Sequence, residues 1–243
     1  FATLERARDE LRRRRVGEPN APFTVHVRAG RYALTRPLQL DGRDSGTAAA
    51  PVVWRGYGDE RPLIQGGRPI TGFVAHEGKI LKADVGAQGF KGIHFRQLLC
   101  DGRQQVLARD PNFDPRNPYG GGWAYADGQA VPMYADVPGE DKRTFRYRAA
   151  DARPWAKPAE AEVLIFPRYN WWNNLVRIAA LDRATRTITL AADCSYAIRP
   201  GDRYYVRNLR EELDAPGEWF LDRAKETLYF WPPDGADLRT VFA

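Results

Sequence analysis

The feature that most restricts the fold is a succession of short β-rich runs, each bounded by glycine, proline or aspartate. No helical periodicity follows Arg15, and the spacing suits a β-sandwich, a barrel or a coiled parallel β-helix. In the first run Val25 and Val27 alternate with His26, so we expect His26 to face away from the apolar pair. The early runs comprise residues 23–28, 37–40, 51–57, 62–65 and 70–74.

One helix precedes these runs. Thr3 is a suitable N-cap, and Leu4, Ala7 and Leu11 share one helical face. The four arginines at positions 12–15 follow at the negative end of the helix dipole, which accounts for them without a binding patch.

From residue 79 to 210 the pattern changes to longer, more aromatic segments in hairpin-like pairs. Residues 94–100 and 104–109 flank an Asp-Gly turn, and residues 174–181 pair with 187–191, which predicts an antiparallel lobe. Residues 109–128 form an irregular stretch with three prolines and three consecutive glycines. A loop of that length inside a domain is usually functional.

Several segments resemble, in order and spacing, the start of secreted right-handed parallel β-helix proteins active on carbohydrates, which have the pectin-lyase-like fold. They are similar to the β-helix glycoside hydrolases with an inserted β-sandwich lobe, such as bacterial β-xylosidases and fucose- or xylan-active relatives. The segments are FATLERA at 1–7, VRAGRY at 27–32, DSGT at 44–47, PVVW at 51–54, GG at 66–67, GEWFLD at 217–222 and TLY at 227–229.

The resemblance implies an all-β fold, with an N-terminal capping helix, the first coils of a right-handed parallel β-helix and an inserted antiparallel β lobe. The expected domains are 1–78 for the cap and first coils, 79–210 for the lobe, and 211–243 for a return to β-helix coils in a truncated chain.

The function implied is that of the N-terminal part of a secreted glycoside hydrolase, extracellular or periplasmic, acting on plant or microbial polysaccharide or oligosaccharide. Its partners would be a carbohydrate substrate and the rest of its own chain or a following β-helix domain. The catalytic carboxylates would lie on later coils, leaving this part inactive alone. Two alternatives stay open: a noncatalytic carbohydrate-binding module, and a polysaccharide lyase on acidic glycans, which the net charge of +6 permits.

Sugar rings present apolar C–H faces to aromatic side chains and hydroxyls to polar ones, and the irregular loop offers both. A second aromatic cluster spans residues 169–174, where adjacent Trp171 and Trp172 on an extended segment should point to opposite faces, one into the core. The predicted substrate-binding residues are Trp123, Arg109, Asn112, Asp114, Tyr119 and Trp172.

The sequence gives little support for a catalytic, nucleotide-binding or metal-binding site. Turns explain the loop carboxylates Asp110, Asp114 and Asp127, each of which precedes proline or glycine. The glycine run lacks the Lys-Ser/Thr of a phosphate loop, residues 41–46 lack the distal glutamate of a calcium loop, and the three histidines are widely spaced. We therefore expect no cofactor, metal or membrane span, and, because acids are interspersed among the arginines, no nucleic acid. Cys100 and Cys194 could pair or stay free.

Overall fold

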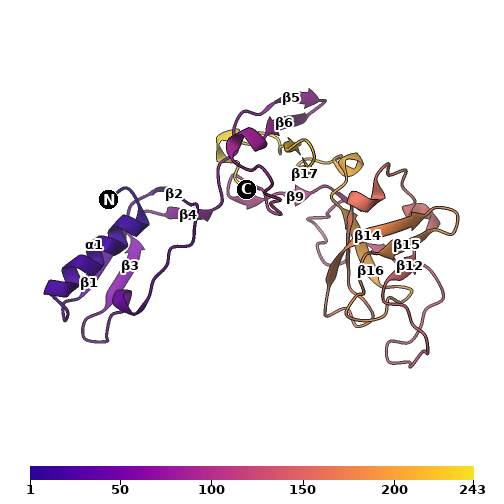
Figure 1. The fold of residues 1–243 in the computed structure, drawn as a ribbon, viewed down its shortest axis with the longest axis horizontal. Helices are drawn as coiled ribbons and strands as arrows, with labels where there is room; N and C mark the ends of the chain where they lie inside the picture. Colours follow the sequence, from indigo (N-terminus) through magenta and orange to yellow (C-terminus); the bar gives the residue numbers. More distant parts are fainter. The chain divides into compact units, whose positions relative to one another are not determined.

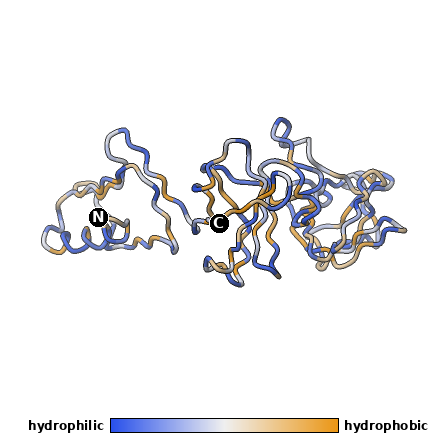
Figure 2. The backbone as a smooth tube through the Cα atoms, turned by 90° about the horizontal axis from the view of Figure 1, so that it is seen from above, coloured by the Kyte–Doolittle hydropathy of each residue, from blue (hydrophilic) through white to orange (hydrophobic).

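The computed structural model describes residues 1–243, which form two compact units (Figure 1). Unit 1 comprises residues 1–69 and Phe242, and unit 2 comprises residues 70–241 and Ala243. The chain is mostly β, with one α-helix and open sheets. Short orange apolar segments alternate with blue polar ones along the tube in Figure 2, and no helix is long and apolar enough to cross a membrane.

The helix of unit 1, α1 (Leu4–Gly17), confirms the sequence prediction. The Thr3 hydroxyl accepts a hydrogen bond from the Arg6 backbone N–H at 3.1 Å, and the predicted apolar face is buried. Its basic end is held by ion pairs within the unit: Glu10 pairs with Arg13, and Arg12 with Asp44. These contacts support the view that the arginine run stabilises the helix end.

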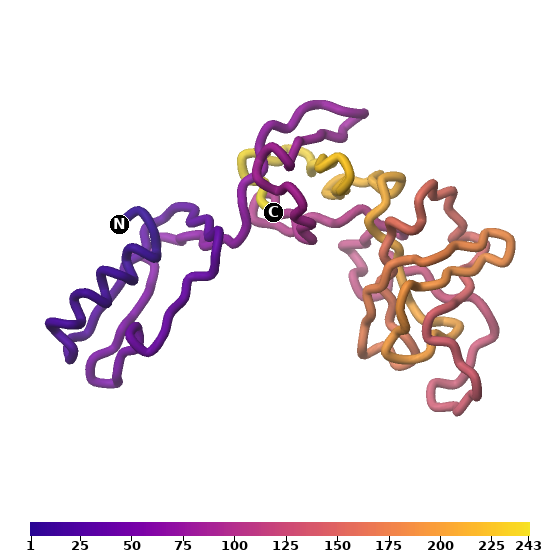
Figure 3. Tube along the Cα trace, in the orientation of Figure 1, coloured from indigo at the N-terminus to yellow at the C-terminus, as the bar shows by residue number.

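Four strands of unit 1 form two parallel ladders. β1 pairs with β3 and β2 with β4 in parallel, so that two successive passages of the chain run side by side. These passages are the indigo to purple part of the trace in Figure 3. Three of the predicted runs are confirmed as strands, whereas residues 37–40 form none and 70–74 contribute only Val74. The strands are β1 (Phe23–Val27), β2 (Gly30–Leu34), β3 (Val52–Gly56) and β4 (Pro62–Gly66).

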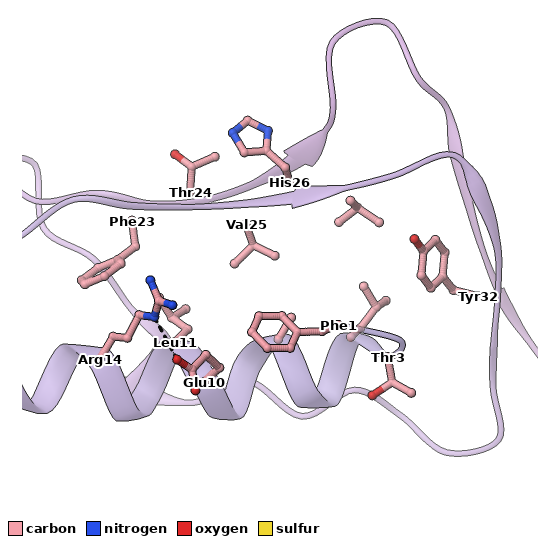
Figure 4. A pocket seen from close by; sticks show the side chains of 13 residues that line it. Phe1, Thr3, Glu10, Leu11, Arg14, Phe23, Thr24, Val25, His26 and Tyr32 are labelled. Carbon is pink, nitrogen blue, oxygen red and sulfur yellow. Dashed lines mark hydrogen bonds and ion pairs between the residues drawn. The ribbon is translucent and has the colours of Figure 1, made fainter.

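Between α1 and β1 lies a cavity of about 230 Å³. Figure 4 shows Phe23 and Val25 pointing across it toward the helix, while Thr24 and His26 point to the opposite side of the strand. The predicted orientation of His26 is thus confirmed.

Unit 2 begins and ends in a five-stranded sheet with the order β5-β6-β18-β17-β9, in which only β9 runs parallel to its neighbour. Its core surrounds Trp219 and Phe230. The predicted Asp101-Gly102 hairpin is confirmed by the pairing of β7 with β8. The strands are β5 (Val74–Glu77), β6 (Ile80–Asp84), β7 (Leu99–Cys100), β8 (Arg103–Gln104), β9 (Val106–Leu107), β17 (Glu218–Asp222) and β18 (Thr227–Phe230).

A seven-stranded antiparallel sheet carries the second core of unit 2, with the order β10-β16-β13-β14-β15-β12 and with β11 also beside β16. The predicted pairing of residues 174–181 with 187–191 is confirmed by β14 and β15. The strands are β10 (Arg109–Asp110), β11 (Ala124–Tyr125), β12 (Thr144–Arg146), β13 (Glu162–Ile165), β14 (Asn174–Asp182), β15 (Thr187–Leu190) and β16 (Arg203–Arg207).

Six short 3-10 helices complete the secondary structure. They are η1 (Gly42–Asp44), η2 (Gly86–Gln88), η3 (Ala149–Asp151), η4 (Pro158–Glu160), η5 (Arg210–Glu212) and η6 (Leu238–Thr240). Cys100 and Cys194 are both buried, and they lie in different cores. They therefore stay free and do not form a disulfide, the second of the two alternatives that the sequence left open.

The last two strands of the chain pair with each other and with two earlier strands. β17 and β18 form an antiparallel hairpin, because the Asp222 carboxylate accepts hydrogen bonds from the backbone of Ala224 and Lys225 and closes a turn. Strands β6 and β9, from the range expected for the lobe, pair with this hairpin, and the seven-stranded sheet extends from Arg109 to Arg207. The domain limits 1–78, 79–210 and 211–243 stay a prediction.

Candidate carbohydrate-binding surface

The seven-stranded sheet has one face on its core and an outer face that carries aromatic and basic side chains. Along β16, Tyr204 and Val206 are buried in the core, so the alternating Arg203, Tyr205 and Arg207 lie on the other side. Phe166, directly after β13, follows the same alternation beyond the buried Ile165.

The irregular loop brings Trp123 onto this outer face. The Trp123 ring lies 5.7 Å from that of Phe166 and 5.3 Å from that of Tyr205, measured between ring centroids. The Arg203 guanidinium lies over Trp123 and Phe166, at 4.9 and 4.3 Å, and that of Arg109 lies 3.5 Å from the Tyr205 ring. These five residues form one half-buried group, which we call the aromatic–arginine stack.

Arg109 holds the loop closed. Its guanidinium donates to the carbonyls of Pro111, at 2.9 Å, and Gly122, which lie far apart in the loop sequence. Burial lowers the pKa of this guanidinium. Gly122 has a φ of +68°, and a Cβ there would lie 2.5 Å from the Asn112 carbonyl, so glycine is required. Arg109 therefore positions Trp123.

The other predicted loop residues have separate roles in the structure. Asn112 donates to the Asp214 carboxylate at 2.9 Å, and the Asp114 carboxylate accepts from the backbone of Arg116 and Asn117, which makes it a turn residue. The Tyr119 ring is exposed, and its carbonyl accepts a hydrogen bond from Arg203. The structure thus gathers Arg109 and Trp123 in the stack and connects Tyr119 to it through Arg203.

The second aromatic cluster corrects one expectation. Both Trp171 and Trp172 are exposed, at 72% and 62%, so neither belongs to the core. The alternation of a strand does not apply here, because Arg168 and Asn170 have positive φ angles of 56° and 57° and turn the chain before the tryptophans. Tyr169 supports Trp171 at a ring distance of 5.4 Å.

The three loop carboxylates make hydrogen bonds or ion pairs within unit 2. Asp110 is buried and pairs with Arg153 at 2.8 Å, and burial raises the pKa of its carboxyl. The cavity beside it has a volume of about 10 Å³, roughly the space of one water molecule. Asp127 pairs with Arg186 at 3.3 Å.

A groove that sequence reasoning missed lies between the five-stranded sheet and the helices η4 and η5. Its volume is about 410 Å³, within the range of small-molecule sites. Tyr229 lines it, with the His76 ring at 4.9 Å from the Tyr229 ring and the Arg210 guanidinium at 5.1 Å. Its charged walls include Lys157, Glu160, Asp222 and Lys225. No local signal could have revealed it, because its residues come from four separate parts of the chain.

The aromatic and arginine side chains of the outer face can contact the apolar faces and the hydroxyls of sugar rings, and the groove is large enough for a small ligand. No family model matches the chain, and no curated protein matches it. It is similar to a solved structure named glycoside hydrolase, with a TM-score of 0.72 and 25% sequence identity over 98% of this chain. The chain spans 41% of the length of that protein.

Proposed function

We propose that this chain is part of a secreted glycoside hydrolase acting on plant or microbial polysaccharide or oligosaccharide. The observation that carries the proposal is the likeness to a glycoside hydrolase along 98% of the chain. The parallel ladders of unit 1 support the further proposal that β1 to β4 are the first coils of a right-handed parallel β-helix, capped by α1. In that architecture the antiparallel sheet is the inserted lobe that walls the sugar cleft.

The proposed contribution of this chain is binding. Hydrolysis of a glycoside needs two carboxyl groups about 5 to 9.5 Å apart on either side of the bond. The loop carboxylates Asp110, Asp114 and Asp127 are occupied by ion pairs and a turn, which supports a catalytic pair outside these residues. Trp123 would stack on a sugar ring, supported by Arg109, and the exposed Tyr119 and Trp172 would supply further contacts.

Replacing Trp123 by alanine tests this assignment. We expect affinity for oligosaccharide to fall by about 1 to 3 kcal/mol, the range for an aromatic anchor, because the ring face is lost. Isothermal titration with xylo-oligosaccharides and fucosylated oligosaccharides would measure it. Phe113→Ala is the matched control, since Phe113 is exposed in the same loop but outside the stack. A lower melting temperature with unchanged affinity would mean that Trp123 only packs the loop.

A second expected result concerns turnover. The 243-residue chain should bind glycan without cleaving it. Cleavage of xylan, fucoside or pectic substrates that is abolished in Asp110→Asn, Asp114→Asn or Asp127→Asn would refute the proposal that the catalytic pair lies outside these residues. In the full-length protein, saturated products would indicate a hydrolase, unsaturated products absorbing in the ultraviolet a lyase, and binding without products a noncatalytic module.

A further inference from the structure

Glu162, at the start of β13, is a buried carboxylate surrounded by more arginines than it can neutralise. Arg207 donates two hydrogen bonds to it, at 3.1 and 2.9 Å. The nearest guanidinium nitrogens of Arg96 and Arg223 lie 3.6 and 4.0 Å from its other oxygen. We call these four residues the arginine cluster. Three positive charges and one negative charge leave it a net charge of +2.

Arg96 and Arg223 are the solvent-accessible arginines of the cluster. Their distances to Glu162 are too long for hydrogen bonds, so their N–H donors remain available to an acceptor from solution. The Arg96 side chain is 64% exposed and that of Arg223 36% exposed. Arg177, opposite Glu162 in the β-ladder, adds a further positive charge on the same face. A planar guanidinium fork matches the geometry of a carboxylate or sulfate group.

Two members of the cluster are neighbours in sequence of residues that line the groove. On one wall, Glu160 lines the groove two residues before Glu162. On the other, Asp222 and Lys225 line it on either side of Arg223. Arg223 and Glu162 approach each other to 4.0 Å, and each is within two residues of a residue that lines this cavity, which is large enough for a sugar unit.

We propose that the arginine cluster is a subsite for an anionic sugar unit, which carries a carboxylate or a sulfate and belongs to a glycan lying in the groove. The inference rests on the proposed carbohydrate function and specifies its substrate class. The carboxylate or sulfate of the sugar is held by Arg96 and Arg223, and Glu162 with Arg207 keeps these side chains in place. The chain has 31 arginines and 6 lysines against 31 acidic residues, and this excess of positive charge favours the approach of such a polyanion.

Binding measurements with three probes test the proposal: oligogalacturonate for the carboxylate, a sulfated galactan oligosaccharide for the sulfate, and xylo-oligosaccharide as the neutral probe. The wild-type chain should bind one anionic probe more tightly than the neutral one. The double variant Arg96→Gln/Arg223→Gln should lose about tenfold or more of that affinity, since the loss of even one charge-assisted hydrogen bond lowers affinity by about this factor. Arg207 is left intact, because its removal would leave a buried carboxylate without its hydrogen-bond donors.

The control is Arg143→Gln, which removes an exposed lobe arginine paired with Asp193 and should leave all three affinities unchanged. Neutral binding should also survive in the double variant, which shows that the fold and the aromatic surface are intact. Equal affinity for neutral and anionic probes in the wild type would overturn the subsite and leave the proposed function standing. Absence of binding to all three probes would overturn both. The probe whose affinity falls in the double variant identifies the anion.

Discussion

Replacing Trp219 by alanine is expected to lower the free energy of unfolding of unit 2 by about 3 to 5 kcal/mol, the range for deleting a buried tryptophan. Trp219 is only 1% exposed and is among the largest fully buried side chains of the chain. Its ring stacks on that of Phe95 at 5.4 Å, and its strand joins β18 on one side and β9 on the other. The variant would leave a cavity where these strands meet.

Urea unfolding followed by circular dichroism measures this loss. Trp171→Ala is the matched control, because the same side chain is removed from an exposed position and should change the free energy of unfolding by less than about 1 kcal/mol. A Trp219→Ala protein as stable as the control would contradict the placement of Trp219 in the core of the five-stranded sheet.

Replacing Glu218 by glutamine is expected to raise stability above pH 7 and to flatten its dependence on pH. Glu218 is buried, and one of its carboxylate oxygens accepts hydrogen bonds from the backbone of Asp214 and Ala215, each at 3.1 Å. Its other oxygen has no hydrogen-bond partner. Burial, reinforced by the nearby charge of Asp214, raises the pKa of this carboxyl from 4.5 to about 7.

The sign of the effect follows from proton binding. Between about pH 4.5 and pH 7 the folded chain holds a proton on Glu218 that the unfolded chain has released, so stability falls as pH rises. Protonated Glu218 contributes fully to the free energy of unfolding below pH 4.5, and this contribution is lost by about pH 8. A pKa shift of this size corresponds to a loss of about 3 kcal/mol in the free energy of unfolding. Glutamine keeps an oxygen for the two backbone donors without the charge. Urea unfolding at pH 5 and pH 8 should therefore show a larger decrease for the wild type than for the variant; equal decreases would refute the perturbed carboxyl.

The length and composition of residues 109–128 point to a functional loop, and in the structure Trp123 of this loop packs against aromatic and arginine side chains. Its supporting residues Phe166, Arg203 and Tyr205 were not predicted, because they lie 43 or more positions away in the sequence. The sequence also does not predict that both Trp171 and Trp172 are exposed. The turn before them uses a left-handed backbone at Arg168 and Asn170, and neither position has the glycine that usually indicates this conformation.

By itself the sequence determined the features that arise from hydrogen bonds and side-chain periodicity within a few residues. These include the capped helix α1, the Asp101-Gly102 hairpin, the β14–β15 pair and the outward orientation of His26. Only the tertiary structure decided the parallel pairing of β9 with β17, the groove around Tyr229 and the arginine cluster around Glu162. Each of these joins segments tens of residues or more apart, and such contacts depend on which apolar faces are buried together, which no local pattern encodes.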